Sequence, residues 1–301
     1  MPWLLIVTIA HLLNAGAFLA DKFLLAKAVP KPAVYAFWIG ILGLVALVLL
    51  PFGFVVPTLE QFAYALLAGG TFEVALLFFF AALRRLETSR VVPVVGGLQP
   101  LIILVLSYAF LGERLARGEL FALALLILGS IIISYDGGRL SLRALRSQRR
   151  GWLYAFVAAI VFSFSFTLTK AVFTTQPFIS GFVWIRIGAF LTVLLFLLRR
   201  EWRHDILEKQ ERPKGKLAVL FFAGQSAGAV SALLLNYAIK LASVTLVTAM
   251  QGLQYAFLFF LAIILGKRFI QLRERLNTVI VIRKSFAIVC ISVGLVVLAY
   301  T

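Results

Sequence analysis

The sequence predicts an all-α membrane protein with ten transmembrane helices, arranged as two inverted five-helix repeats. Three observations predict it: an apolar composition, ten apolar stretches of membrane-spanning length, and basic residues concentrated in every second connection. The chain has 301 residues, 62% of them hydrophobic, and its mean hydropathy is +1.04. A soluble domain of this size cannot bury so much apolar surface, whereas a bilayer accepts it.

The ten apolar stretches have the lengths expected of membrane spans, since roughly 20 residues cross a hydrocarbon core about 30 Å thick. Their expected bounds are 3–23, 33–51, 60–83, 91–112, 118–135, 152–172, 178–198, 217–239, 244–265 and 284–300. No Lys or Arg precedes the first stretch, so it lacks the basic region of a secretory signal peptide. We therefore expect a retained first helix and a function that lies within the bilayer.

Basic residues mark one side of this arrangement. The connections after spans 1, 3, 5, 7 and 9 hold 24 of the 29 Lys and Arg residues. The opposite connections hold only Arg114, Arg117, Lys170 and Lys240. Because basic loops stay in the cytoplasm, both termini are expected on the extracytoplasmic side of the plasma (inner) membrane. The net charge of +17 has the same explanation, so no nucleic-acid partner is expected.

The two halves of the chain resemble each other. Gly97-Leu98-Gln99 recurs as Gly252-Leu253-Gln254, an offset of 155 residues. We expect a first repeat with its basic cytoplasmic linker over residues 1–150 and a second repeat over 151–301. Five spans per repeat is an odd number, so the second copy must enter the membrane upside down. Inverted repeats are typical of secondary transporters, whose binding sites lie near the midplane between the repeats.

The second half carries an insertion of about 11 residues between spans 9 and 10, judged from the spacing of Gly266 and Gly294 against Gly112 and Gly129. Basic residues there flank the apolar run 279–282. This pattern predicts a short surface-lying turn or an extension of the last helix.

One continuous run carries a resemblance to a known family. Residues 81–115 contain an Ala-Leu-Arg-Arg start, Thr88-Ser89, a mid-span Pro100 and an exit sequence Gly112-Glu113-Arg114-Leu115. This run resembles the EamA family of the drug/metabolite transporter (DMT) superfamily, and the resemblance extends over essentially the whole chain. It implies a ten-helix carrier, and many members of the family export amino acids or other small metabolites.

Span 7 adds to the resemblance, and two positions depart from it. Trp184-Ile185-Arg186-Ile187 is similar to a segment of the family in which the second helix of a repeat carries an arginine. The second half has Gly266-Lys267-Arg268-Phe269 where the family pattern has Gly-Glu-Arg-Leu. The first half has Gly40 near the position that corresponds to Arg186.

Two charged residues lie near the middle of predicted spans. Glu73 is near the middle of span 3, where a carboxylate costs about 2.5–3.5 kcal/mol on insertion scales, and Gly69 one turn away favours an inward-facing, closely packed surface. We expect Glu73 to carry a coupling proton or to bind a substrate amine. Arg186 does not readily lose its proton, so it should hold a substrate carboxylate or phosphate. The alternative for both residues is a salt bridge with each other.

Uncharged polar residues in other spans are further candidates for the substrate site. Asn14 lies on the same helical face as His11. Gln99 precedes Pro100, which removes a backbone hydrogen bond and kinks the helix. In span 9, Thr248, Gln251 and Tyr255 share a polar face with Gln254 beside it. The alternative for these residues is that they join helices by hydrogen bonds.

Trp38 and Trp184 occupy similar places in spans 2 and 7, where they either cap a substrate or pack. The expected substrate-binding residues are therefore Glu73, Arg186, Gln99, Gln254, Asn14, Tyr255, Trp38 and Trp184, with Glu73 also as the proton-coupling residue.

Motifs of other protein classes are absent from the sequence. There is no HExxH, no Walker-type phosphate loop and no serine nucleophile elbow, and Cys290 is the only cysteine. We expect no enzyme activity, no cofactor and no metal site.

The prediction is a secondary transporter that moves a small polar or amphipathic metabolite by alternating access, with export as the expected direction. The alternatives are an intramembrane enzyme for a lipid-linked substrate and a receptor or assembly factor. Substrate identity, coupling ion and oligomeric state are left open, and a monomer is allowed.

Overall fold

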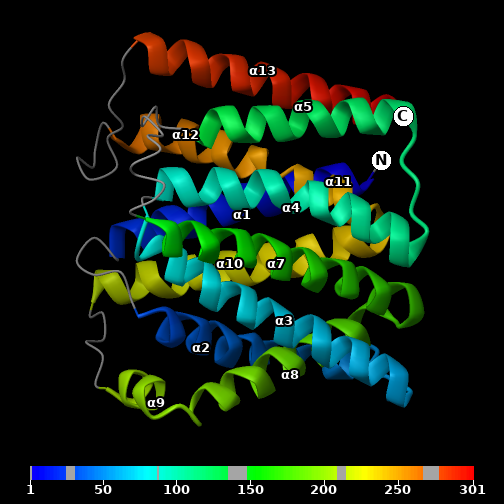
Figure 1. The fold of residues 1–301 in the computed structure, drawn as a ribbon, viewed down its shortest axis with the longest axis vertical. Coiled ribbons are helices and arrows are strands. Elements are labelled where there is room, and N and C mark those ends of the chain that lie inside the picture. Colours follow the sequence, from blue (N-terminus) through cyan, green and yellow to red (C-terminus); the bar gives the residue numbers. More distant parts are fainter. Residues whose placement is uncertain (1, 25–30, 87, 135–147, 209–214, 267–277) are drawn as a thin grey trace.

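A computed structural model describes residues 2–24, 31–86, 88–134, 148–208, 215–266 and 278–301. All regular secondary structure within these ranges is helical. The long helices lie side by side and run in roughly the same direction across the view of Figure 1.

The helices fall into two groups of five spans. The first half has α1 (Pro2–Leu24), α2 (Pro32–Gly43) continued by the 3₁₀ helix η1 (Leu44–Phe52), α3 (Leu59–Leu83), α4 (Thr88–Leu111) and α5 (Arg117–Ser134). The second half has α7 (Arg149–Thr175), α8 (Phe178–Phe196), α9 (Arg200–Leu207), α10 (Lys216–Leu241), α11 (Val244–Ala249), α12 (Gly252–Gly266) and α13 (Thr278–Tyr300).

The predicted fold class is confirmed by these elements. Nine segments of the described residues are long and apolar enough to cross a membrane. The remaining predicted span is α10, whose 26 residues extend about 39 Å at 1.5 Å per residue. The chain is a multi-pass membrane protein.

Four details differ from the predicted spans. Span 2 changes from α to 3₁₀ geometry at Leu44, ahead of Pro51, whose missing N–H cannot continue an α-helical ladder. Span 9 is interrupted at Met250 and Gln251, between α11 and α12. The short helix α9 lies in a connection for which no helix was predicted. The last span begins at Thr278 rather than 284, so the expected extension of this helix is found; residues 267–277 lie outside the described ranges.

The halves are interlocked by their first helices. The first helix of each half packs on the third and fourth spans of the other half: α1 contacts α10 and α12, and α7 contacts α3 and α4. Both interfaces are tied by serine hydroxyls, since Ser231 Oγ donates to Ala10 O and Ser165 Oγ to Ala68 O, each at 2.8 Å. Two further pairs, α2 with α8 and α5 with α13, join equivalent spans. This exchange is what two related five-span units produce when they pack about a common pseudo-twofold axis.

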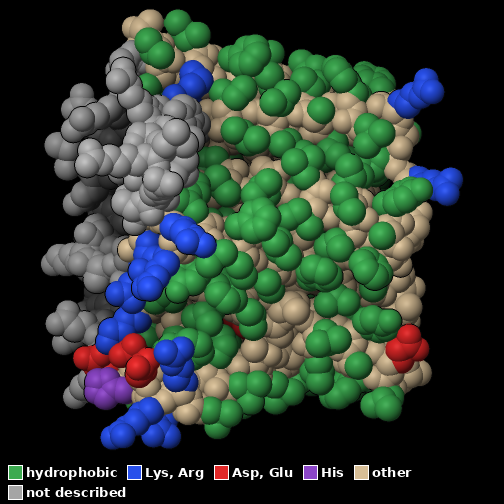
Figure 2. All heavy atoms as spheres, viewed as in Figure 1, with side chains coloured by type: hydrophobic (Ala, Val, Ile, Leu, Met, Phe, Trp, Pro, Cys, Tyr) green, Lys and Arg blue, Asp and Glu red, His purple; other side chains and the backbone are tan. Residues whose placement is uncertain are grey.

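The two ends of the bundle differ in charge. Figure 2 shows apolar side chains over the middle of the molecule, a concentration of Lys and Arg at one end, and few charges at the other. Helix α9 lies at the basic end, and both termini lie at the opposite end (Figure 1). Gly118 at the start of α5 packs directly against the Thr301 side chain, which also places the C-terminus there.

Candidate functional site

Helices α3 and α8 cross at two glycines, and this crossing positions Glu73 and Arg186. A Cβ on Gly69 would collide with the backbone of α8 at Ile185 O, and one on Gly188 would lie 2.6 Å from Leu66 Cα. Only glycine permits such a close approach of two backbones. Glu73 lies one turn beyond Gly69 on the same face, and Arg186 follows Ile185 on α8.

Glu73 and Arg186 are neighbours without being bonded. Glu73 is 0% exposed, and neither carboxylate oxygen has a hydrogen-bond partner among the described residues. The Arg186 guanidinium lies over the rings of Phe182 and Phe72, 4.9 and 6.0 Å from their centroids. The two charges interact electrostatically, but within the described part of the chain no N···O contact of 4.0 Å or less joins them. The direct salt bridge considered from the sequence is therefore not formed in this structure.

Phe72 and Phe182 were not among the predicted residues. Each lies within about one helical turn of a charged residue, next to Glu73 in one case and four residues before Arg186 in the other. Aromatic faces attract cations. Phe182, four residues before Arg186, could therefore have been predicted from the sequence to contact the guanidinium.

A second polar contact joins two predicted residues across the halves. Asn14 Nδ2 on α1 donates to Gln254 Oε1 on α12 at 2.9 Å. His11, one turn before Asn14, is 3% exposed, and among the described residues neither ring nitrogen has a partner. Polar side chains of α1 are therefore directed into the protein at the level of the interrupted span 9.

The proline kink of α4 meets the polar face of span 9. Pro100 has no N–H, so the carbonyl of Gly96, four residues earlier, loses its helical donor. The space beside Gly96 is filled by Tyr255 and Gln251, whose side-chain oxygens lie 3.2 and 3.4 Å from where a Cβ would stand. Gln99 is 6% exposed, and its carbonyl accepts a hydrogen bond from Ser163 Oγ at 3.2 Å. Tyr255 of span 9 thus lies beside α4 at Gly96, whereas the hydrogen bond of Gln99 is made to α7.

The two tryptophans occupy aromatic packing positions. Trp38 is 46% exposed and lies edge-on to Phe37. Trp184 packs against Phe54 and Phe62, with ring centroids 5.6 and 5.0 Å away. Their contact with a substrate stays a prediction.

Two shallow grooves on α3 and α8 are separate from the charged residues. Their volumes are about 330 and 290 Å³, and leucine side chains make up much of their lining, with Leu66 and Thr192 shared by both. Neither groove is lined by Glu73 or Arg186.

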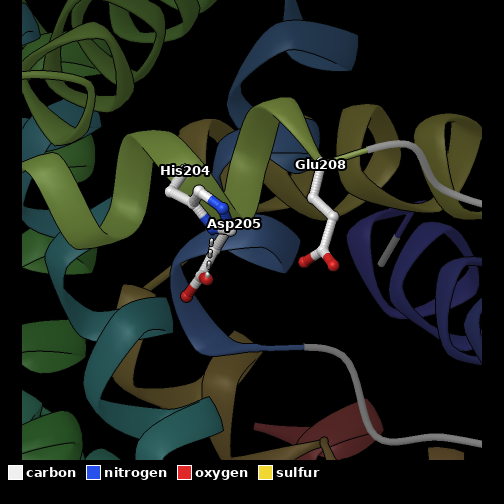
Figure 3. A group of neighbouring side chains, drawn as sticks. All are labelled: His204, Asp205 and Glu208. Atoms are coloured by element: carbon white, nitrogen blue, oxygen red, sulfur yellow. Dashed lines mark ion pairs between the residues drawn. The ribbon is translucent and has the colours of Figure 1, made fainter.

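A group of potential metal ligands lies on α9, away from the membrane-spanning helices. The ligand atoms of His204, Asp205 and Glu208 are within 4.8 Å of one another (Figure 3). Lys31 Nζ donates to Asp205 at 2.7 Å and to Glu208 at 3.2 Å. These bonds raise the pKa of Lys31, and the bond from Lys31 lowers the pKa of Asp205. The Lys31 ammonium therefore occupies the place that a metal cation would take beside the two carboxylates. Its hydrogen bonds connect the start of α2 to α9.

Ten helical spans in the described part of the chain, with charged and polar side chains buried between them, define a polytopic membrane protein. The chain belongs to the EamA-like transporter family, which matches residues 1–135 and again residues 149–298. The predicted resemblance to the DMT superfamily is therefore confirmed, and the family consists of transporters rather than enzymes.

The fold is also that of a solved crystal structure whose description names no activity. It has a TM-score of 0.71 and 20% sequence identity, covering 98% of this chain and 96% of the other. No curated protein matches the chain.

Proposed function

We propose that the protein is a secondary transporter that exports a small zwitterionic or amphipathic metabolite by alternating access. One observation carries the proposal: an intramembrane carboxylate and a guanidinium lie close together, yet neither is paired with the other. Charges inside a membrane are costly and mark substrate or proton pathways. Two adjacent, opposite charges held apart by the fold form a receptor for a molecule that carries both.

An amino-acid-like solute has the chemistry that this receptor would accept. The planar guanidinium of Arg186 would bind a carboxylate through two parallel hydrogen bonds, and Glu73 would bind the ammonium group. Phe72 and Phe182 would contact the apolar part. The hydrogen-bonding groups of Gln99, Gln254, Asn14 and Tyr255 would orient the solute. Trp38 and Trp184 stay predicted contacts.

Glu73 would also couple transport to protons. With no ammonium bound, a carboxylate buried without hydrogen bonds is stabilised by taking up a proton. Binding of the substrate cation would release that proton, and departure of the substrate would restore it. Transport without coupling is the competing mechanism, and the dependence of flux on an imposed pH gradient separates the two.

The pseudo-twofold arrangement supports alternating access. Residues 1–150 and 151–301 would rock against each other about the polar interior. The basic end with α9 would face the cytoplasm of the plasma (inner) membrane, and both termini would lie outside. A reporter fused after Thr301 tests this orientation, since it should be active only in an extracytoplasmic compartment.

The central test is flux in proteoliposomes loaded with a panel of amino acids and related metabolites. Glu73→Gln and Arg186→Gln should each lower flux at least about tenfold, because each removes one charge of the receptor. Arg186→Lys should recover little, since lysine lacks the bidentate fork. Arg203→Gln on the exposed face of α9 is the matched control and should transport normally. Normal flux and unchanged pH dependence in both site variants would refute the site.

A further inference from the structure

The end of the bundle that carries both termini contains a partly buried polar cluster. Lys170 Nζ, near the end of α7, donates to Ile239 O and Ala242 O at 2.9 and 2.7 Å. The same ammonium lies 3.9 Å from Glu113 Oε1, in the connection after α4. Ser243 Oγ donates to the other oxygen of Glu113 at 3.1 Å. The Lys170 and Glu113 side chains are only 13% and 17% exposed, respectively.

The chemistry of this cluster explains why it holds. The last carbonyl groups of a helix have no intrahelical donors and carry the negative end of its dipole. Lys170 directs its ammonium at two such carbonyls from the end of α10, and the third interaction of the ammonium is with Glu113. Two of the three ammonium donors are used on these carbonyls, and the contact with Glu113 at 3.9 Å is an ion pair. One side chain therefore caps α10 and binds the opposite half of the protein.

A second contact repeats this connection deeper in the bundle. Ser107 on α4 and Thr245 on α11 share a hydrogen bond of 3.2 Å, and their exposed fractions are 1% and 0%. The N–H of Glu113 donates to Ser107 O at 3.1 Å, which fixes the segment between the two layers. The Lys170–Glu113 contact and the Ser107–Thr245 contact each join a residue of the first half to a residue of the second.

Among the described residues at the basic end, the ion pairs of Lys31 that link the halves are more exposed. There the contact of Lys31 with Asp205 and Glu208 also links the halves, but these side chains are 47%, 26% and 55% exposed. Exposed ion pairs contribute little because water and salt compete for both partners. The ion pair of Lys170 with Glu113 is thus better shielded from water than those of Lys31 with Asp205 and Glu208.

We propose that Lys170, Glu113 and Ser243 form the latch of a gate at this end, and that the structure holds the gate closed. The proposal rests on the proposed function, because a gate requires a pathway to close. Opening would withdraw Lys170 from Glu113 and separate Ser107 from Thr245, so that solute reaches the polar residues of span 9 from the terminal side. The latch would give Glu113 of the Gly-Glu-Arg-Leu exit sequence a structural purpose.

The test measures access to a cysteine behind the latch. Thr248→Cys places a thiol on α11, at a half-buried hydroxyl that bonds only within its own helix, to Val244 O and Thr245 O. Cys290→Ala removes the native thiol. A membrane-impermeant thiol reagent is applied from the side where a tag after Thr301 is accessible to protease. Lys170→Met and Glu113→Gln should each raise the labelling rate about tenfold, as loss of charge-assisted bonds shifts the population toward the open state.

Controls separate the latch from general loosening. Arg114→Gln removes an exposed charge next to Glu113 and should leave labelling slow. Lys170→Arg keeps the cation and should also label slowly. All variants should elute from size-exclusion chromatography at the wild-type volume; Glu113→Gln retains most hydrogen bonds and serves if Lys170→Met does not fold. Equal labelling rates in Glu113→Gln and Arg114→Gln would overturn the latch.

A disulfide tests the gate by its effect on flux. Ser107→Cys with Thr245→Cys, in the Cys290→Ala background, should form a disulfide, because the hydroxyl oxygens that the thiols replace are 3.2 Å apart, and the oxidised protein should lose flux that reduction restores. Full flux in the oxidised protein would overturn the gate. Labelling as expected, with no solute moved by the wild type, would instead overturn the transport proposal and leave the latch standing.

Discussion

Helices α3 and α8 form a tightly packed pair that carries Glu73 and Arg186. Their counterparts in the repeat, α10 and α2, neither pack on each other nor carry charges at these positions. The 155-residue offset carries Glu73 onto Gly228. The position that corresponds to Arg186 is near Gly40. Contact between α3 and α8 is extensive, whereas α10 and α2 are not among the packed pairs. The repeat therefore supplies the scaffold, and departures from the repeat supply the charged receptor.

Equivalent glycines explain how the two pairs diverge. Gly69 on α3 faces the backbone of α8, but its counterpart Gly224 faces Ala20 of α1, with a Cβ distance of 2.9 Å. Gly228 likewise faces Ala17 of α1, at 3.7 Å. The same small-residue surface is thus used against a different helix in each half. Close approach to the arginine-bearing helix occurs on one side only, and that is where the carboxylate lies.

The largest effect is expected from filling the α3–α8 crossing. Gly69→Ala would place a methyl group on Ile185 O and 2.5 Å from Ala189 N, where backbone cannot easily move. Overpacking of this kind should cost about 3 kcal/mol. We expect a large fall in the thermal midpoint of detergent-solubilised protein, read from the monodisperse fraction after heating. Gly228→Ala, with only an ordinary contact to make, should unfold like the wild type. Equal midpoints for the two variants would show that the crossing is not essential.

The second-largest effect is expected from placing a carboxylate on α10, the counterpart of α3 in the second half. Gly228→Glu creates on α10 the carboxylate that α3 carries, but without Arg186 beside it. An intramembrane acid costs about 2.5–3.5 kcal/mol on insertion scales, and no equivalent arginine offsets it because Gly40 occupies that position. The yield of inserted protein should fall well below that of Gly228→Gln, which serves as the neutral control. Equal yields would mean that α10 offers the environment that we assign to α3 alone.

A smaller effect is expected at the polar contact between α1 and α12. The hydrogen bond from Asn14 to Gln254 joins side chains, whereas the contact of Ser163 with Gln99 on the other side reaches the backbone. A double-mutant cycle of Asn14→Ala with Gln254→Ala should give a coupling energy of about 0.6–1.7 kcal/mol, the range for hydrogen bonds between membrane helices. Ser163→Ala with Gln99→Ala should give almost none, since the backbone carbonyl stays in both variants. Similar coupling in both cycles would contradict this difference between a side-chain contact and a backbone contact.

The features predicted from sequence are local ones. Apolar length located the spans, and the nearby Gly69 predicted that Glu73 faces the interior. The repeated tripeptide also has a local cause: a Cβ on Gly97 would lie 3.0 Å from Ile131, and one on Gly252 would strike Ser130, so both glycines pack on neighbouring residues of α5.

The features that were missed depend on how distant segments align. The interruption of span 9 has no proline or polar run to announce it. The pairing of Lys170 with Glu113 joins different halves, and only the register between the halves decides it. Helix α9 did leave a trace, since Trp202 and Ile206 are spaced four apart among polar residues, which is typical of one face of a short amphipathic helix.

The smallest effect is expected where the halves differ outside the membrane. The connection after α8 contains α9, bound to Lys31, while residues 53–58 after η1 carry no charge.

The bond from Lys31 lowers the pKa of Asp205. The contribution of Asp205 to folding stability is therefore present above its unfolded pKa of about 3.9 and is lost as pH falls through the lower folded value. The pKa of Lys31 is raised, so its contribution persists below the unfolded pKa of about 10.4 and is lost as pH rises beyond the folded value. Lys31→Met should therefore lower the thermal midpoint by no more than about 2 °C between these limits, and the difference from wild type should vanish once the pH falls below the lowered pKa of Asp205. Arg200→Gln, exposed on α9, should show no such pH dependence; a Lys31 effect that survived in acid would mean that the residue acts through packing rather than through its charge.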